Sequence, residues 1–202
     1  MNDHILNVSE VFYSLQGEGE RAGEASIFIR LQGCKTKHAC AASGIVCDTE
    51  FESGKPMKVS DIIAHIRQWP CDWIVWTGGE PLDQLTPELV THLKDQGYKQ
   101  AVETSGLRSV EGMEFDHICV SPKVAEHIVA KNFPAFVHEL RYVRHKGQDI
   151  PQPSVRALSY FLSPHSDGFT INKENLRHCI DLCLKHPQWC LSVQQHKQWN
   201  VL

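Results

Sequence analysis

Three cysteines, Cys34, Cys40 and Cys47, lie close together in the first quarter of the chain. Neighbouring thiolates are ligands for iron–sulfur clusters and for zinc. Cysteine pairs in zinc sites are usually about two to four residues apart, and this chain has no such pair here. The spacing leaves three interpretations open: a [4Fe–4S] cluster with one iron free to bind a ligand, a zinc site completed by His38, or incidental cysteines.

A glycine pair and a carboxylate follow the cysteines in the segment Thr77–Pro81, which directly follows a short apolar run. The two glycines allow the backbone to approach a ligand closely. The carboxylate of Glu80 can bind an ammonium group, and Pro81 stiffens the turn. Together with the cysteines, this segment favours a cluster whose open iron binds a small ligand that carries both a positive and a negative charge.

Three more polar segments each follow an expected strand: 103–106, 121–123 and 194–197. The hydrophobic pattern predicts strands at 8–14, 26–31, 73–77, 99–103, 117–120, 136–143, 157–162 and 189–194, and helices at 59–69, 86–97 and 172–186. This alternation implies parallel strands, whose carboxyl ends gather such segments at one edge. Because a full eightfold barrel needs about 250 residues, we expect an open, partial β/α barrel of the TIM type as a single domain over 1–202.

Finer patterns predict how some of these elements pack. Along 26–31, Ile27 and Leu31 share an apolar face, which places Arg30 on the opposite face. Ser60 is the expected N-cap of the helix at 59–69. The helix at 172–186 is expected to direct an apolar face inward, made of Leu176, Ile180, Cys183 and Leu184.

The composition is that of an ordinary globular protein of 202 residues, with 42% hydrophobic and 22% charged residues and a formal net charge of −4. This charge argues against general nucleic-acid binding, and no apolar run is long enough to span a membrane. The N-terminus lacks the pattern of a signal peptide, so we expect the cytoplasm. Cysteines there serve as ligands, catalytic thiols or core residues, and core packing is expected for Cys119, Cys179 and Cys183.

The chain resembles the radical S-adenosylmethionine enzymes and, more narrowly, the 7-carboxy-7-deazaguanine synthases of the queuosine precursor pathway. The matching segments are 15–19, 28–34, 47–50, 77–81, 103–106, 121–123 and 194–197. Gly-Gly-Glu-Pro is common to the superfamily, whereas Gln-Gly-Glu-Gly and the final Gln-x-His-Lys indicate this synthase. One position departs from the superfamily pattern: Gly44 stands where the middle cysteine would fall. We therefore expect a modified cluster-binding loop with Cys40 as the middle ligand.

The resemblance implies a set of cofactors. Cys34, Cys40 and Cys47 would hold a [4Fe–4S] cluster, whose fourth iron binds S-adenosylmethionine and whose electron releases a 5′-deoxyadenosyl radical. The residues expected to bind S-adenosylmethionine are Asp48, Gly78, Gly79, Glu80, Ser121 and Lys123. The resemblance also implies an electron donor such as flavodoxin and a homodimer.

The implied substrate is 6-carboxy-5,6,7,8-tetrahydropterin, converted to 7-carboxy-7-deazaguanine with loss of ammonia. Its expected ligands are Gln16, Glu18, Arg30, Glu103 and His196, with Glu103 also catalytic. Mg²⁺ would bind the substrate carboxylate, with Thr49 as its protein ligand. Two alternatives stay open: another radical S-adenosylmethionine enzyme, such as a glycyl-radical activase, which would not need these substrate ligands, and a zinc-stabilised binding module.

Overall fold

A nine-stranded sheet forms the centre of the protein in a computed structural model that describes residues 4–47, 49–168 and 170–202. Its order is β11-β8-β7-β6-β5-β4-β2-β1-β3. The strands are β1 (Ile5–Leu15), β2 (Ala25–Leu31), β3 (Lys55–Lys58), β4 (Trp73–Gly78), β5 (Lys99–Thr104), β6 (His117–Val120), β7 (Phe136–Arg144), β8 (Arg156–Pro164) and β11 (Cys190–Leu191). A separate two-stranded sheet pairs β9 (Ser166–Asp167) with β10 (Thr170–Ile171).

The predicted α/β class with parallel strands is confirmed, because every neighbouring pair from β2 to β11 runs parallel. The other edge differs from the expectation, since β1 pairs antiparallel with both β2 and β3. The sheet ends at β11 on one side and at β3 on the other, so it is open. The structure therefore supports an open, mostly parallel sheet and does not establish the curvature of a barrel.

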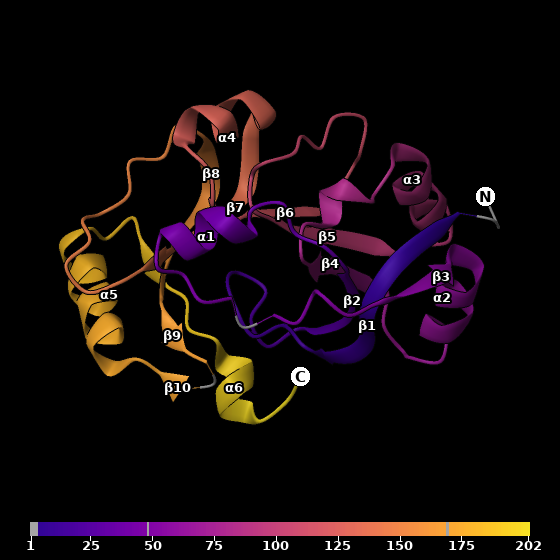
Figure 1. Ribbon diagram of the computed structural model, residues 1–202, viewed down its shortest axis with the longest axis horizontal. Coiled ribbons are helices and arrows are strands. Elements are labelled where there is room, and N and C mark those ends of the chain that lie inside the picture. The colour runs from indigo at the N-terminus through magenta and orange to yellow at the C-terminus, as the bar shows by residue number, and fades with distance from the viewer. Residues whose placement is uncertain (1–3, 48, 169) are drawn as a thin grey trace.

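The helices are distributed around this sheet (Figure 1). They are α1 (Lys37–Ala42), α2 (Val59–Ile66), the 3₁₀ helix η1 (Pro81–Asp83), α3 (Pro87–Asp95), α4 (Glu126–Asn132), α5 (Lys173–Lys185) and α6 (Gln195–Trp199). In Figure 1, α2 and α3 lie at the β1 end of the molecule, α5 lies at the opposite end, and α1 lies between them. None of the helices within the described ranges is long and apolar enough to cross a membrane.

The two faces of the sheet differ in chemistry. Ile27, Ile29 and Leu31 are fully buried in the main hydrophobic core, which also contains the apolar sides of α2 and α3. The opposite face carries polar residues: Arg30 pairs in register with Thr77, and Glu103 with Cys119. The predicted alternation along β2 is thus confirmed, and the polar face is free to build a site.

The predictions of helix caps and of the inward face of α5 were only partly confirmed. Thr86 caps α3 by accepting a hydrogen bond from a backbone amide, as its sequence predicts. Ser60 does not cap α2: the N-cap is Lys58, and Ser60 lies within the first turn. In α5 the prediction for Leu184 was wrong, because its side chain is 77% exposed, whereas Cys179 is buried. The inward face is rotated because α5 also buries Asn175, whose side chain bonds Lys146 and His165.

Candidate active site

The cysteine segment forms a compact loop between β2 and β3, into which α1 is inserted. Thr36 is buried, its hydroxyl lies 3.1 Å from the Cys34 sulfur, and its carbonyl accepts a hydrogen bond from the Cys40 amide at 2.9 Å. The amide of Ile45 in turn bonds the Cys40 carbonyl. These bonds turn the chain back on itself, so cysteines that are separated in sequence border a common space.

Two adjoining cavities of about 230 and 550 Å³ share the three cysteines in their walls. Thr49 also lines both cavities, and the smaller one reaches the ends of β4, β5 and β6. The structure therefore brings the predicted cluster ligands and the predicted Mg²⁺ ligand to one place. Asp48, predicted to bind S-adenosylmethionine, lies outside the described residues.

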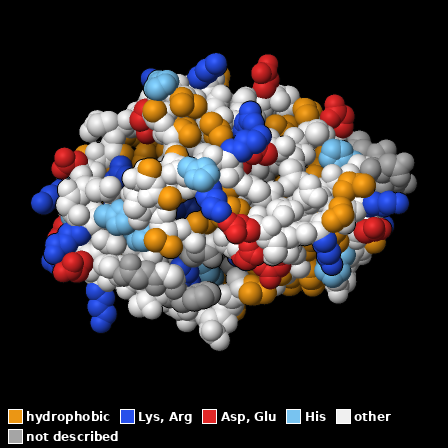
Figure 2. Space-filling model, viewed as in Figure 1, with side chains coloured by type: hydrophobic (Ala, Val, Ile, Leu, Met, Phe, Trp, Pro, Cys, Tyr) orange, Lys and Arg blue, Asp and Glu red, His pale blue; other side chains and the backbone are white. Residues whose placement is uncertain are grey.

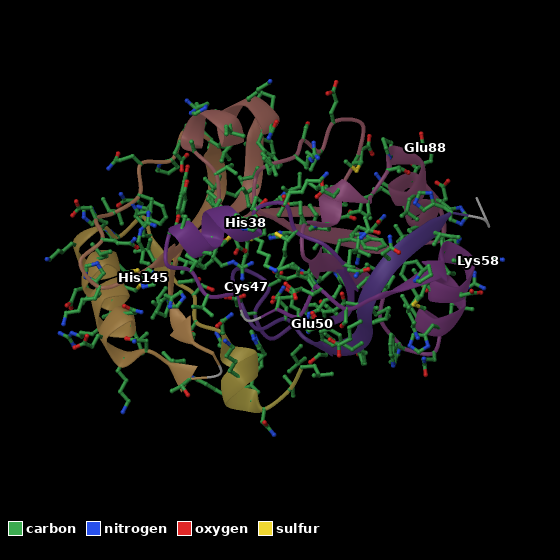
Figure 3. The ribbon with its side chains drawn as sticks, in the orientation of Figure 1. His38, Cys47, Glu50, Lys58, Glu88 and His145 are labelled. Carbon is green, nitrogen blue, oxygen red and sulfur yellow. The ribbon has the colours of Figure 1, made fainter. Side chains whose placement is uncertain are left out.

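The placement of the thiols bears on whether they hold a cluster or a single ion. Among the residues that the structure describes, no three His, Cys, Asp or Glu side chains converge on one metal position. His38, the expected fourth zinc ligand, is exposed on α1, while Cys47 lies on the segment that follows α1 (Figure 3). A cluster spaces its three thiolate ligands around several irons, and thiols that line the walls of one cavity are compatible with it.

The glycine pair brings the end of β4 against the cysteine loop. A Cβ on Gly79 would lie 1.8 Å from the Gly33 carbonyl oxygen, and Gly78 has a φ of +111°. The Glu80 amide donates to that same carbonyl at 2.8 Å. Both glycines line the smaller cavity. The two glycines thus allow the end of β4 to approach Gly33, the residue before Cys34, as well as any ligand that binds in the cavity.

The carboxylate of Glu80 is fully buried and already bonded. It accepts hydrogen bonds from the Thr104 hydroxyl at 2.7 Å, from the Ser105 amide at 3.0 Å and from the Ser105 hydroxyl. In the part of the chain that the structure describes, the smaller cavity is lined by Thr104 and Ser105 rather than by Glu80. The observed role of Glu80 is therefore to join the ends of β4 and β5.

Ser121 and Lys123 form another wall of the smaller cavity. Lys123 Nζ donates to the Ser121 hydroxyl at 2.6 Å, and the Lys123 amide bonds the Ser105 carbonyl. Burial lowers the pKa of Lys123 and raises that of Cys40, while the Lys123 charge opposes the change at Cys40. This wall thus places an ammonium group near a cysteine ligand candidate.

A network of charged side chains that includes Glu18, Glu103 and Arg141 lines one wall of the smaller cavity and is called the charged floor. Arg141 contacts Glu18 and Glu103, each at 2.9 Å, and Gln16 donates to Glu103 at 3.1 Å. Thr77 donates to the other oxygen of Glu103 at 3.2 Å. Three of the five predicted substrate ligands, Gln16, Glu18 and Glu103, are therefore connected to one another through this network.

The other two predicted substrate ligands lie elsewhere. Arg30 pairs with Glu10 at 2.8 Å, and its guanidinium lies 4.8 Å from the ring centre of Phe12. His196 packs against Gly17, where a Cβ would approach its ring nitrogen to 2.1 Å. Neither side chain belongs to the cavity lining found in the described ranges. Arg30 shares the polar face of the sheet, and His196 fixes α6 to the loop that carries Glu18.

Sequence reasoning missed Arg141 and Glu139, and it treated Cys119 only as a core residue. All three are buried, but they occupy the polar face of β6 and β7, where Arg141 Nη2 donates to the Cys119 sulfur at 2.9 Å. The sequence carried a signal for them, because Glu139 and Arg141 alternate with apolar residues in the central, buried part of β7. Charged residues two positions apart in such a strand indicate a buried ion pair or a site.

Comparisons with known proteins agree closely on one family. The chain is 35% identical to the 7-carboxy-7-deazaguanine synthase of Bradyrhizobium diazoefficiens, covering 96% of this chain and 98% of that protein. It is 37% identical to the 7-carboxy-7-deazaguanine synthase of Burkholderia multivorans, with the same coverage. The crystal structure of QueE from Escherichia coli superposes with a TM-score of 0.70 at 25% identity, covering 95% of both chains. No general family model matches the chain.

Proposed function

The chain belongs to the 7-carboxy-7-deazaguanine synthase family, and on this premise we propose how its residues carry out the reaction of a radical S-adenosylmethionine lyase. The substrate is 6-carboxy-5,6,7,8-tetrahydropterin, and the product is 7-carboxy-7-deazaguanine with ammonia. One observation carries the proposal: the three cysteines border both the loop cavity and the cavity that reaches the charged floor. A cluster in the first would thus adjoin a substrate in the second.

Cys34, Cys40 and Cys47 hold the [4Fe–4S] cluster in this proposal. When bound, the cluster and S-adenosylmethionine supply the radical that removes hydrogen from the substrate. The backbone of Gly78 and Gly79, with Ser121 and Lys123, surrounds the S-adenosylmethionine. Glu80 acts mainly by holding the Thr104–Ser105 turn through hydrogen bonds. For its carboxylate to contact the methionine ammonium, one of those hydrogen bonds must break.

Glu18 and Glu103 accept hydrogen bonds from the N–H groups of the pterin, and Gln16 orients Glu103. Glu103 is the proposed catalytic residue because it lies in the cavity and has bonded oxygens that fix its orientation. Mg²⁺ bound at Thr49 would neutralise the substrate carboxylate. A single hydroxyl, with substrate oxygens and waters, suits Mg²⁺ because this ion gives up its water reluctantly.

The family and the free thiols support a proposal for the setting of the enzyme. All eight cysteines fall in the described part of the chain and are free. Free thiols are typical of a reducing compartment, so we propose a cytoplasmic, single-domain enzyme that forms a homodimer and receives electrons from a donor such as flavodoxin. Figure 2 shows acidic, basic and hydrophobic side chains intermixed on one face.

An anaerobic assay tests the function directly. The purified, iron-loaded protein is incubated with S-adenosylmethionine and a reductant, with and without the pterin, and 5′-deoxyadenosine and 7-carboxy-7-deazaguanine are measured. We expect the deazaguanine to form only with the pterin and in proportion to enzyme. Formation of 5′-deoxyadenosine without any deazaguanine, at all pterin concentrations, would show that the chain acts on another substrate.

Arg30 provides a sharper test of the substrate site. Because Arg30 shares the polar face but pairs with Glu10, we expect it to leave that pair and bind the substrate carboxylate. Arg30→Ala should raise the KM for the pterin by about tenfold, the effect of losing roughly 1.4 kcal/mol of binding. Cleavage of S-adenosylmethionine without pterin should stay within about twofold. Glu10→Ala is the matched control, and it should leave the KM unchanged or lower it. Equal loss of both activities in Arg30→Ala would exclude the substrate role.

A further inference from the structure

Arg141 lies at the centre of the charged floor, and its side chain is only 6% exposed. Its Nη1 contacts Glu18 at 2.9 Å, its Nη2 contacts Glu103 at 2.9 Å, and its Nε lies 3.0 Å from Glu139 without the geometry of a hydrogen bond. The three carboxylates come from the loop after β1, from β5 and from β7. One guanidinium thus connects three separate parts of the fold.

Arg141 offsets part of the negative charge of this network. Three carboxylates face one guanidinium, and the other groups nearby are Lys123, His117 and the Cys119 thiol. Burial raises the pKa of Cys119 well above its usual value, so this thiol is neutral. Burial also acts to raise the pKa of Glu139, but the Arg141 charge and hydrogen bonds from His117 and the Glu20 amide hold it at about 2. Without the guanidinium, the buried Glu139 carboxylate would take up a proton more readily.

We propose that Arg141 is a positioning residue that holds Glu18 and Glu103 in fixed directions, so that both accept hydrogen bonds from the N–H edge of a heterocyclic substrate. This inference rests on the proposed function, in which those two carboxylates bind the pterin. The planar fork of arginine reaches two carboxylates with separate N–H groups. A lysine at this position keeps the charge but cannot hold both carboxylates in fixed directions.

The test compares Arg141→Met, which removes the charge, with Arg141→Lys, which keeps it. Arg177→Met is the matched control, because Arg177 is 75% exposed on α5 and pairs only with Asp181 among the ion pairs in the described residues. The measurements are the KM and kcat for the pterin, the pH dependence of kcat/KM, iron content, melting temperature, and 5′-deoxyadenosine formed without pterin. Wild-type turnover in the same assay separates failure of this inference from failure of the proposed function.

We expect Arg141→Met to raise the KM for the pterin by at least about tenfold, while iron content and pterin-free cleavage stay within about twofold. Its acid limb of kcat/KM should move to higher pH, because Glu139, whose pKa the Arg141 charge lowers, binds a proton more readily without the guanidinium. Arg141→Lys should raise the KM less and keep the acid limb in place. A folded, iron-loaded Arg141→Met with unchanged KM and acid limb overturns the inference. If Arg141→Met does not fold, an unchanged KM in Arg141→Lys overturns it.

Discussion

Replacing Cys40 by alanine is expected to eliminate the iron–sulfur cluster and all cleavage of S-adenosylmethionine. Cys40 lies on α1, and it lines both cavities together with Cys34 and Cys47. Three thiolates are needed to hold three irons while the fourth remains open, and two thiolates hold such a cluster poorly. Iron and sulfide per chain after anaerobic reconstitution, with visible absorbance, measure the loss. We expect less than about a tenth of the wild-type iron to remain, since structural metal binding weakens steeply when a ligand is removed.

Cys71→Ala is the matched control for this experiment. Cys71 is also a half-buried free thiol, but it lies between α2 and β4, where its sulfur bonds the Ala25 and Trp73 carbonyls. Its iron content and absorbance should equal those of the wild type. Full iron content and activity in Cys40→Ala would show that the middle ligand is another residue.

The structure of the loop supports the proposal that Cys40 takes the place of the usual middle ligand. Gly44, which stands at the usual position, follows the end of α1 with a φ of +72° and contacts nothing within 4 Å where a Cβ would be. A cysteine there would need a left-handed backbone that side chains other than glycine rarely adopt. The helical turn of α1 instead presents Cys40, one turn earlier, to the same space. The loop thus keeps three thiols with altered spacing.

The parts of the fold that the sequence predicts are those set by local chemistry. Thr86 and Pro87 begin α3 because a capping hydroxyl and a proline suit the first helical turn. The strand at His117–Val120 is confirmed residue for residue, since its apolar run has no competing pattern. The short helices α1 and α6 were not predicted, because their stability depends on contacts such as the Gln195 amide with the Gly17 carbonyl.

The same distinction applies to the site. Motifs at strand ends located the cysteines, Gly79 and Ser121, because parallel strands place their carboxyl ends together. The sequence does not predict which charged side chains pair with one another. No local pattern shows that Arg30 bonds Glu10, or that Arg141 joins Glu18 to Glu103. These partners are distant in sequence, and only the register of the sheet brings them into contact. Residues that line a common cavity are thus easier to predict than the partners that orient them.

Replacing Gly79 by alanine is expected to disrupt the site almost as completely as loss of a cysteine. The added Cβ would lie 1.8 Å from the Gly33 carbonyl oxygen, whereas carbon and oxygen atoms in close contact are normally about 3.3 Å apart or more. The obstacle is backbone on both sides, so no side chain can rotate away. The end of β4 must therefore separate from the loop that begins at Cys34.

That separation also breaks hydrogen bonds that hold the site together. The Gly79 amide bonds the Leu31 carbonyl at 2.9 Å, and the Glu80 amide bonds the Gly33 carbonyl at 2.8 Å. Overpacking combined with loss of buried hydrogen bonds costs on the order of 3 kcal/mol. We expect a fall in melting temperature and in retained iron. Binding of S-adenosylmethionine, measured by calorimetry on the reconstituted protein, should weaken by more than about tenfold.

Gly54→Ala is the control that makes this prediction specific. Gly54, like Gly79, has a φ outside the left-handed region, and a Cβ there would lie 2.8 Å from its nearest neighbour, the Gln32 side-chain oxygen. The Gln32 Cβ and Cδ would each lie 3.0 Å away, and because all three contacts are with one flexible side chain, a small shift relieves them and Gly54→Ala should cost less than about 1 kcal/mol. Both substitutions add the same methyl group, so a difference in stability between the two variants reports how rigid the neighbouring atoms are: backbone at Gly79 and the Gln32 side chain at Gly54. Equal stability, iron content and ligand binding in the two variants would mean that β4 and the cysteine loop can separate without loss, and that the glycine is not required for their contact.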